Sequence, residues 1–246
     1  MGPMISCSER DGHPLPCGLR IAVATARGRP YYYFSALLNR LGVAFDSLLP
    51  EQMRTYAGHL VLTTESEFLG PGRCSRPVLL FEDVAGSPPA VVCGMMMRRI
   101  GACYGGCGCS GGGGKTPADD LIIGIDPGQR NGLSISYCGH EIESSVHPSV
   151  DNLVSQVIRV FGGLPARRRL VRIGDGDMKT ANEIARVLNL RFCSSFDLEF
   201  VDESRTSPKI KHFNCRGRRD ILSARHISRR DGRHRQRTVM PLSMTG

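Results

Sequence analysis

No stretch of this sequence stays apolar over the roughly 18 residues that a membrane-spanning helix needs, so we expect no transmembrane segment and no membrane partner. Residues 1–17 also lack the continuous apolar core of a secretory signal, and we expect a flexible leader there. The ten cysteines form no repeating framework. A disulfide-stapled secreted scaffold is the alternative, but it fits poorly with a long chain that shows no signal. We therefore expect reduced thiols and a cytoplasmic protein.

Two phosphate-binding signatures are also missing. The N-terminal part has no G-x-G-x-x-G, and the run GGGGKT fails as a phosphate loop because Cys109 stands where the first glycine is required. The glycine-rich residues 101–118 instead predict a flexible linker. Cys103, Cys107 and Cys109 could hold zinc or an iron–sulfur cluster, but no fourth ligand lies nearby.

The positive charge is concentrated at one end of the chain. The net charge is +9, and residues 201–246 hold 12 of the 32 Lys and Arg but only 4 of the 23 Asp and Glu. Such asymmetry indicates an anionic partner, most often nucleic acid. A disordered, solvated tail is the alternative. The apolar spacing of Ile221, Leu222, Ala224 and Ile227 favours a folded helix instead.

Strand and helix patterns alternate in residues 18–100, which predicts a small parallel α/β domain. Its expected strands are 19–25, 43–49, 59–64 and 77–82, and its expected helices are 30–42 and 91–102. A second domain is expected at 119–235, with a tail at 236–246. Its expected strands are 121–126, 131–138, 140–147, 168–177 and 196–203, and its expected helices are 148–163, 178–190 and 218–230.

The segment LIIGIDPG at 121–128 places a carboxylate at the end of a buried strand. The strand fixes the backbone of Asp126, and Pro127-Gly128 ends it, so the carboxylate oxygens face solvent. Hard cations such as Mg²⁺ take oxygen ligands. The alternative is an ordinary turn aspartate ahead of Pro-Gly.

The element order resembles the ribonuclease H-like fold: three antiparallel strands, then helix, strand, helix, strand and helix. Residues 119–233 contain the segments IGIDPGQRNGLSIS, RIGDGD, VDESRTS and RRDILSARHI. On these segments they are most similar to the RuvC/YqgF branch of that fold, which includes Holliday junction resolvases, and VDESRTS resembles the D-E-R-x-[ST]-[ST] segment of the YqgF group. The whole chain also resembles archaeal two-domain proteins without an assigned activity. The resemblance implies a mixed five-stranded sheet with flanking helices.

The resemblance further implies that carboxylates far apart in the sequence converge. Asp126, Asp175 and Asp220 are the matched acids and would bind Mg²⁺ or Mn²⁺, and Glu203 is a candidate fourth catalytic residue. Two divalent ions about 3.5–4 Å apart can stabilise the attacking and leaving oxygens of a phosphodiester. Holding such ions requires several carboxylates, which otherwise repel one another.

Each acid also has a structural explanation. Asp175 lies between two glycines and could make a turn, and Asp177 could be the metal ligand instead or could cap the next helix. Asp220 lies in the first turn of a helix, where the helix dipole favours acids. Glu203 could pair with Arg205 or with the basic tail.

Arginines flank the last acid and are expected to contact phosphates of a nucleic acid; an ordinary cationic face is the alternative. They are Arg216, Arg218, Arg219, Arg225, Arg229 and Arg230. His226 on the same helix could orient water or act as a base, although a structural histidine is the alternative.

These features predict a metal-dependent nuclease that hydrolyses structured DNA or RNA, and the resolvase resemblance suggests a homodimer. A non-catalytic nucleic-acid-binding module with the same fold is the second hypothesis. A nucleotide-binding regulator or ATPase, like the actin-like relatives of this fold, is the third. The absence of a phosphate-loop signature and the basic tail count against that third hypothesis.

Overall fold

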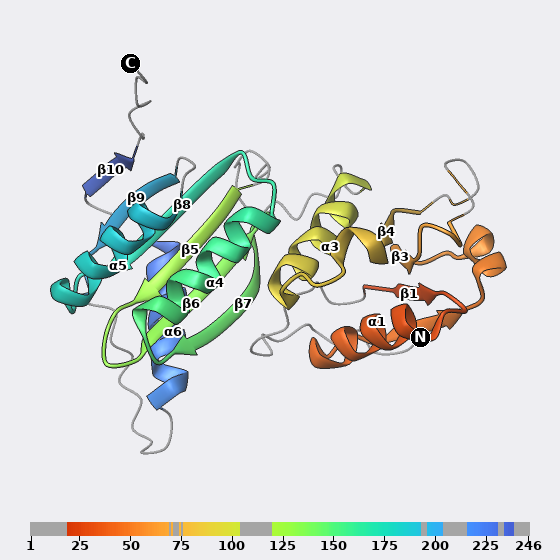
Figure 1. Cartoon of the computed structure of the whole chain (residues 1–246), viewed down its shortest axis with the longest axis horizontal. Helices are drawn as coiled ribbons and strands as arrows, with labels where there is room; N and C mark the ends of the chain where they lie inside the picture. The colour runs from red at the N-terminus through yellow and green to blue at the C-terminus, as the bar shows by residue number, and fades with distance from the viewer. Residues whose placement is uncertain are drawn as a thin grey trace, which may run out of the picture. The chain divides into compact units, whose positions relative to one another are not determined.

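The computed structural model describes residues 19–68, 70, 74, 76–103, 120–192, 196–203, 216–230 and 234–238. The chain divides into two compact units, Met1–Gly113 and Gly114–Gly246 (Figure 1). This division falls within the expected linker 101–118, although residues 101–103 continue a helix. The expected leader, Cys107 and Cys109 lie outside the described residues. Within the described ranges, no helix is both long enough and apolar enough to cross a membrane.

The first unit is a parallel α/β domain, as predicted. All three strand pairings of its four-stranded sheet, ordered β2-β1-β3-β4, are parallel. The strands are β1 (Ile21–Ala24), β2 (Phe45–Leu48), β3 (Leu60–Thr63) and β4 (Val78–Leu80). The helices are α1 (Gly28–Arg40), the 3₁₀ helix η1 (Pro50–Thr55), α2 (Phe81–Val84) and α3 (Pro89–Cys103).

The strand predicted at 77–82 is too long. It ends at Leu80, and Phe81 begins the short helix α2. The Phe81 ring packs edge-on against Tyr33 and Phe34 of α1, with ring centroids 5.4 Å and 6.0 Å apart. Phe81 is therefore held by aromatic packing against α1, and it does not pair as part of a strand.

The second unit has a six-stranded mixed sheet in the order β10-β9-β8-β5-β6-β7. Strands β5, β6 and β7 form an antiparallel meander, β8 lies parallel to β5, and β9 lies parallel to β8. The strands are β5 (Asp120–Asp126), β6 (Asn131–Tyr137), β7 (His140–His147), β8 (Arg168–Gly174), β9 (Phe196–Val201) and β10 (His234–Thr238). The helices are α4 (Val150–Gly163), α5 (Met178–Arg191) and α6 (Arg216–Arg229).

The five predicted strands are thus present in one mixed sheet, and β10 is an addition. It pairs antiparallel with β9 and spans the boundary expected between 235 and the tail 236–246. The mixed α/β class agrees with the prediction, whereas membership of the ribonuclease H-like group stays a prediction.

Helices cover both faces of this sheet. Figure 1 shows α4 and α5 on one face and α6 on the other. On the α4 and α5 side the sheet presents Ile123, Ile125, Leu133 and Ile135, none of which is exposed to solvent. This apolar layer is the main core of the unit and fixes the strands that carry the acids.

The α6 face is lined by small residues. Gly124 of β5 and Gly132 of β6 lie under the helix, so a Cβ atom at Gly124 would collide with the Ala224 carbonyl oxygen and lie 2.6 Å from the Ser228 Cβ. A Cβ atom at Gly132 would collide with the Asp220 carbonyl oxygen. The helix backbone therefore rests almost directly on the strand backbone.

Candidate carboxylate site

Asp126 is the last residue of β5, on the side of the sheet that α6 covers. Its carboxylate accepts a hydrogen bond from the hydroxyl of Ser223 on α6. Gly132 is its antiparallel register partner, and a Cβ atom there would lie 3.3 Å from the Asp126 Cβ. The carboxylate is therefore held between the end of the strand and the helix.

Asp220 belongs to the same helix and is half-buried. Its backbone carbonyl lies against Gly132, which fixes the height of this end of α6 above the sheet. Ser223 follows Asp220 by three residues, and side chains at that spacing lie on one side of a helix. The hydrogen bond from Ser223 to Asp126 therefore also turns Asp220 toward the end of β5.

Glu203 comes two residues after β9 ends and reaches over the end of β8. Cβ atoms at Gly174 and Gly176 would both collide with its carboxylate oxygens. The backbone N–H of Gly176 donates a hydrogen bond to this carboxylate. The two glycines of RIGDGD therefore make room for Glu203, a use that the sequence does not reveal.

Asp175 and Asp177 have different roles. Asp175 is exposed, and its Oδ1 accepts a hydrogen bond of 2.9 Å from the backbone N–H of Glu203. Asp177 caps helix α5, where its carboxylate accepts bonds of 3.2 Å from the Thr180 backbone N–H and 2.8 Å from the Thr180 hydroxyl. Asp175 thus lies beside the carboxylate group, and Asp177 serves the helix.

Burial raises the pKa of Asp126 to about 7, with the charges of Glu203 and Asp220 adding to that rise. Ser223 and the guanidinium of Arg219 act in the opposite direction. Charges interact appreciably only over short distances in a hydrated protein, so Asp126, Glu203 and Asp220 form one electrostatic group.

The pKa values of the two neighbours are raised as well. Burial raises the pKa of Glu203, against the hydrogen bond from Gly176, and the charge of Asp175 raises it further. Burial also raises the pKa of Asp220, although Arg130 and Arg219 act to lower it. The charge of Asp175 therefore acts on Glu203, and the charge of Glu203 in turn acts on Asp126.

The carboxylates interact with one another but do not form a complete metal-coordination site among the described residues. In the part of the chain that the structure describes, no three His, Cys, Asp or Glu side chains lie close enough to hold one metal ion together. The donors nevertheless suit a hard divalent cation, because they are all carboxylate oxygens crowded in a partly desolvated place.

Two of the six predicted phosphate-binding arginines, Arg225 and Arg230, are hydrogen-bonded within the fold. Arg225 donates to Glu141 of β7 at 2.8 Å and to the Ser144 hydroxyl at 3.2 Å, so it braces α6 against the sheet. Arg230 donates to the Asp202 carbonyl oxygen at 3.1 Å. Arg219 and Arg229 are exposed, as is His226, whereas the side chains of Arg216 and Arg218 lie outside the described part.

Two residues at the site escaped the sequence analysis. Ser223 is a serine in a helix, and only the packing of α6 on β5 reveals its bond to Asp126. Arg130 lies in the turn between β5 and β6, where its charge reaches Asp220. Its place in the run DPGQRNG, four residues after Asp126, was the available signal.

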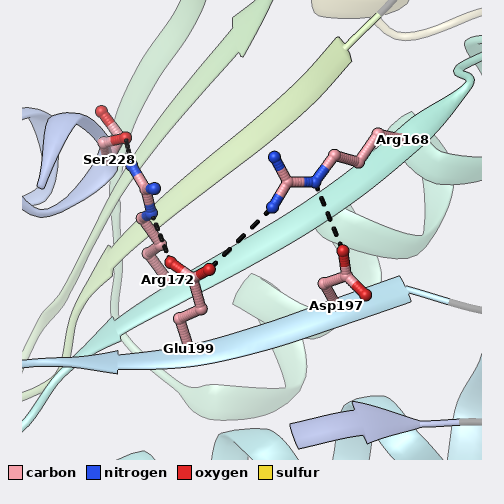
Figure 2. A network of polar contacts seen from close by, with 5 residues as sticks. All are labelled: Arg168, Arg172, Asp197, Glu199 and Ser228. Carbon is pink, nitrogen blue, oxygen red and sulfur yellow. Dashed lines mark hydrogen bonds and ion pairs between the residues drawn. The ribbon is translucent and has the colours of Figure 1, made fainter. Parts of the chain in front are cut away.

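A buried ionic network lies on the same face of the sheet (Figure 2). The Arg172 guanidinium donates to Glu199 at 2.9 Å and to the Ser228 carbonyl oxygen, near the end of α6, at 2.7 Å. Arg168 pairs with Asp197 at 3.3 Å and lies 3.9 Å from Glu199. Strands β8 and β9 are thereby tied to the helix that carries Asp220.

No protein-family model matches the sequence, and no curated protein matches it. The function therefore has to be inferred from the residues and their arrangement.

Proposed function

We propose that this protein is a metal-dependent nuclease that hydrolyses phosphodiester bonds in structured DNA or RNA. The observation that carries the proposal is that Asp126 at the end of β5, Asp220 on α6 and Glu203 just beyond β9 form one group. Burial, and then the charges of the other two acids, raise the pKa of Asp126 in this group. The resemblance of residues 119–233 to the RuvC/YqgF branch supports the same function, with a branched DNA junction as the first substrate to test. A cytoplasmic homodimer belongs to this proposal.

The site fits Mg²⁺ or Mn²⁺ in its donor chemistry, because a bound cation would offset the repulsion among the three carboxylates. Asp126, Asp220 and Glu203 are the residues that would hold it, with Asp175 adjoining Glu203. When bound, the metal would activate water and stabilise charge on the phosphodiester oxygens.

The chain's own residues prepare the site. Ser223 orients the carboxylate of Asp126, and the backbone N–H of Gly176 orients that of Glu203. The half-buried setting limits water around these oxygens, which strengthens their interaction with a cation. The exposed arginine side chains near Asp220 supply positive charge for an anionic substrate.

The second candidate is a nucleic-acid-binding module in which the acids are structural. It is favoured by the finding that, among the described residues, no three possible ligands converge on one point. This candidate predicts salt-sensitive binding without metal-dependent cleavage.

A cleavage panel separates the two candidates. The substrates are a four-way DNA junction, an RNA–DNA hybrid and single strands, each with Mg²⁺ or Mn²⁺. We expect cleavage by the native protein and a rate at least about 100-fold lower for Asp126→Asn, since losing even an indirect metal partner costs 10–100-fold. Asp177→Asn is the matched control and should keep full activity, because Asn also caps helices. An Asp126→Asn protein that cleaves at the native rate would refute the nuclease proposal.

A further inference from the structure

Two exposed arginines flank Asp220 from different elements. Arg130 lies in the turn between β5 and β6, and Arg219 immediately precedes Asp220 on α6. Neither makes a hydrogen bond or ion pair within the described residues, whereas Arg172 and Arg225 are bound to acids of the sheet. The guanidinium N–H groups of Arg130 and Arg219 are therefore available to a ligand, unlike those that Arg172 and Arg225 donate within the fold.

The position of Arg130 is fixed by the residues on either side of it. Asn131 is 2% exposed, and its Oδ1 accepts a bond of 3.4 Å from the Gly128 backbone N–H, which closes the turn. Gly132 then packs against the carbonyl oxygen of Asp220. Arg130 is thus attached to the site by a short, anchored turn and not by a long loop.

The position of Arg219 is fixed by α6, which the glycines of the sheet hold from below. Its charge acts on both Asp126 and Asp220, and the charge of Arg130 acts on Asp220. The two guanidinium groups therefore stand next to the acids from the hairpin side and from the helix side.

The chemistry of such an arrangement suits a phosphodiester. A group of carboxylates alone repels a phosphate, so a substrate phosphate needs fixed positive charge around the acids. A guanidinium offers paired N–H donors that match two oxygens of one phosphate, which lysine does not.

We propose that Arg130 and Arg219 form a phosphate-binding pair that holds the non-bridging oxygens of the substrate phosphodiester beside Asp126 and Asp220. This inference rests on the proposed function for the reaction that it serves. It assigns a binding role to Arg130 and assigns Arg225, which is occupied by Glu141 and Ser144, to the structure of the fold.

The test measures binding apart from cleavage. The full chain is titrated against a fluorescein-labelled four-way DNA junction in Ca²⁺, over a series of salt concentrations, and cleavage is assayed separately in Mg²⁺. The variants are Arg130→Gln, Arg219→Gln and Arg130→Lys. The matched controls are Arg159→Gln on α4 and Arg186→Gln on α5, two exposed arginines on the opposite face of the sheet.

We expect each glutamine variant of the pair to weaken binding at least about 10-fold, the factor that one charge-assisted hydrogen bond supplies. Each should also reduce the slope of log K against log salt by about 0.9, the value for one phosphate contact. Arg130→Lys should restore the salt slope but only part of the affinity, because the paired donors are gone. The controls should bind like the native protein, and thermal midpoints equal to theirs show that the variants are folded.

If Arg130→Gln and Arg219→Gln lose no more binding affinity for the junction than the controls do, the phosphate-binding pair is refuted, whether or not the native protein cleaves DNA. Selective loss of binding in a protein that never cleaves would instead uphold the pair and remove the nuclease proposal. Selective loss of binding together with slower cleavage would uphold both.

Discussion

At the scale of single residues, the site is defined by acids held where water is scarce. Asp126 lies at the end of β5 near Glu203 and Asp220, and burial together with the charges of these two acids opposes its ionisation. An acid whose pKa is raised in the folded state makes that state less stable once it ionises. The acids therefore lower the stability of the folded state at neutral pH.

This cost predicts a pH dependence. The pKa of Asp126 is about 7 in the folded protein and about 4 in an unfolded chain. Between these values the folded state holds a proton that the unfolded state has lost, so the free energy of unfolding falls as pH rises from about 4 to about 7. We expect Asp126→Asn, which cannot ionise, to show a smaller fall, because Glu203 and Asp220 also have raised pKa values and still contribute to it. Urea denaturation in EDTA at several pH values within and above this window measures it.

Asp177→Asn is the control, because the pKa of Asp177 is shifted in the opposite direction from that of Asp126. Bonds from Thr180 lower the pKa of Asp177, so this residue titrates below the window and the slope should remain. If Asp126→Asn and the native protein show equal slopes, Asp126 does not carry the excess proton. Added Mn²⁺ should stabilise the native protein above about pH 7 more than it stabilises Asp126→Asn.

At the scale of elements, most strands and helices could be predicted because turn-forming and helix-capping residues mark their ends. Pro127-Gly128 ends β5, Gly139 turns the chain at a positive φ of 80°, and Ser149 caps α4 through its bond with the Asn152 backbone N–H. Where such signals are missing, the prediction failed. Phe81 continues an apolar run without a break, so the change from strand to helix was invisible.

Strand β10 was missed for a different reason. The sequence HRQRT has no apolar alternation, and its strand character comes from pairing with the edge of β9. The site shows the same limit. The positions of the acids could be predicted from element ends, but the bond from Ser223 to Asp126 depends on how α6 is rotated on the sheet.

The network of Figure 2 yields a prediction about α6. Arg172 is 7% exposed and Glu199 is 1% exposed, so removing Arg172 leaves a buried carboxylate from which the Arg168 guanidinium is 3.9 Å away. We expect Arg172→Met to lower the free energy of unfolding by about 3–5 kcal/mol. The double variant Arg172→Met with Glu199→Leu should recover part of that loss. Urea denaturation measures both proteins.

The exposed pair between Arg191 and Asp151 serves as the control for this experiment. Its side chains are 45% and 84% exposed, so Arg191→Met should cost no more than about 1 kcal/mol. A cost of that size for Arg172→Met would show that the network does not hold α6 to the sheet.

At the scale of the whole molecule, the two units differ in what they offer for chemistry. In the first unit, the carboxylate of Glu67 lies beyond the ends of β1 and β3. It accepts bonds of 2.5 Å from the Thr25 hydroxyl, 2.7 Å from the Thr64 hydroxyl and 2.8 Å from the Ala26 backbone N–H. This edge of a parallel sheet is where ligands commonly bind. Here the chain's own carboxylate occupies it, and the proposed chemistry belongs to the second unit.

The division of the chain predicts that the second unit folds alone. Each unit has its own buried core, with Met53 and Val61 in the first and Ile123 and Val157 in the second. We expect residues 114–246, expressed separately, to unfold cooperatively and to gain the same thermal stabilisation from Mn²⁺ as the full chain. Circular dichroism on heating checks both. A non-cooperative transition would mean that this unit needs the first for its stability.

The glycines beneath α6 have a consequence for how this protein tolerates change. The geometry of the acid group depends on atoms that are missing at positions 124 and 132, where even a methyl group would meet helix backbone. The helix cannot yield locally, so it would have to move as a rigid rod and take Asp220 with it. Exposed residues of the helix meet no such steric limit, whereas at these two positions a substitution as small as alanine would alter the distance between the acids.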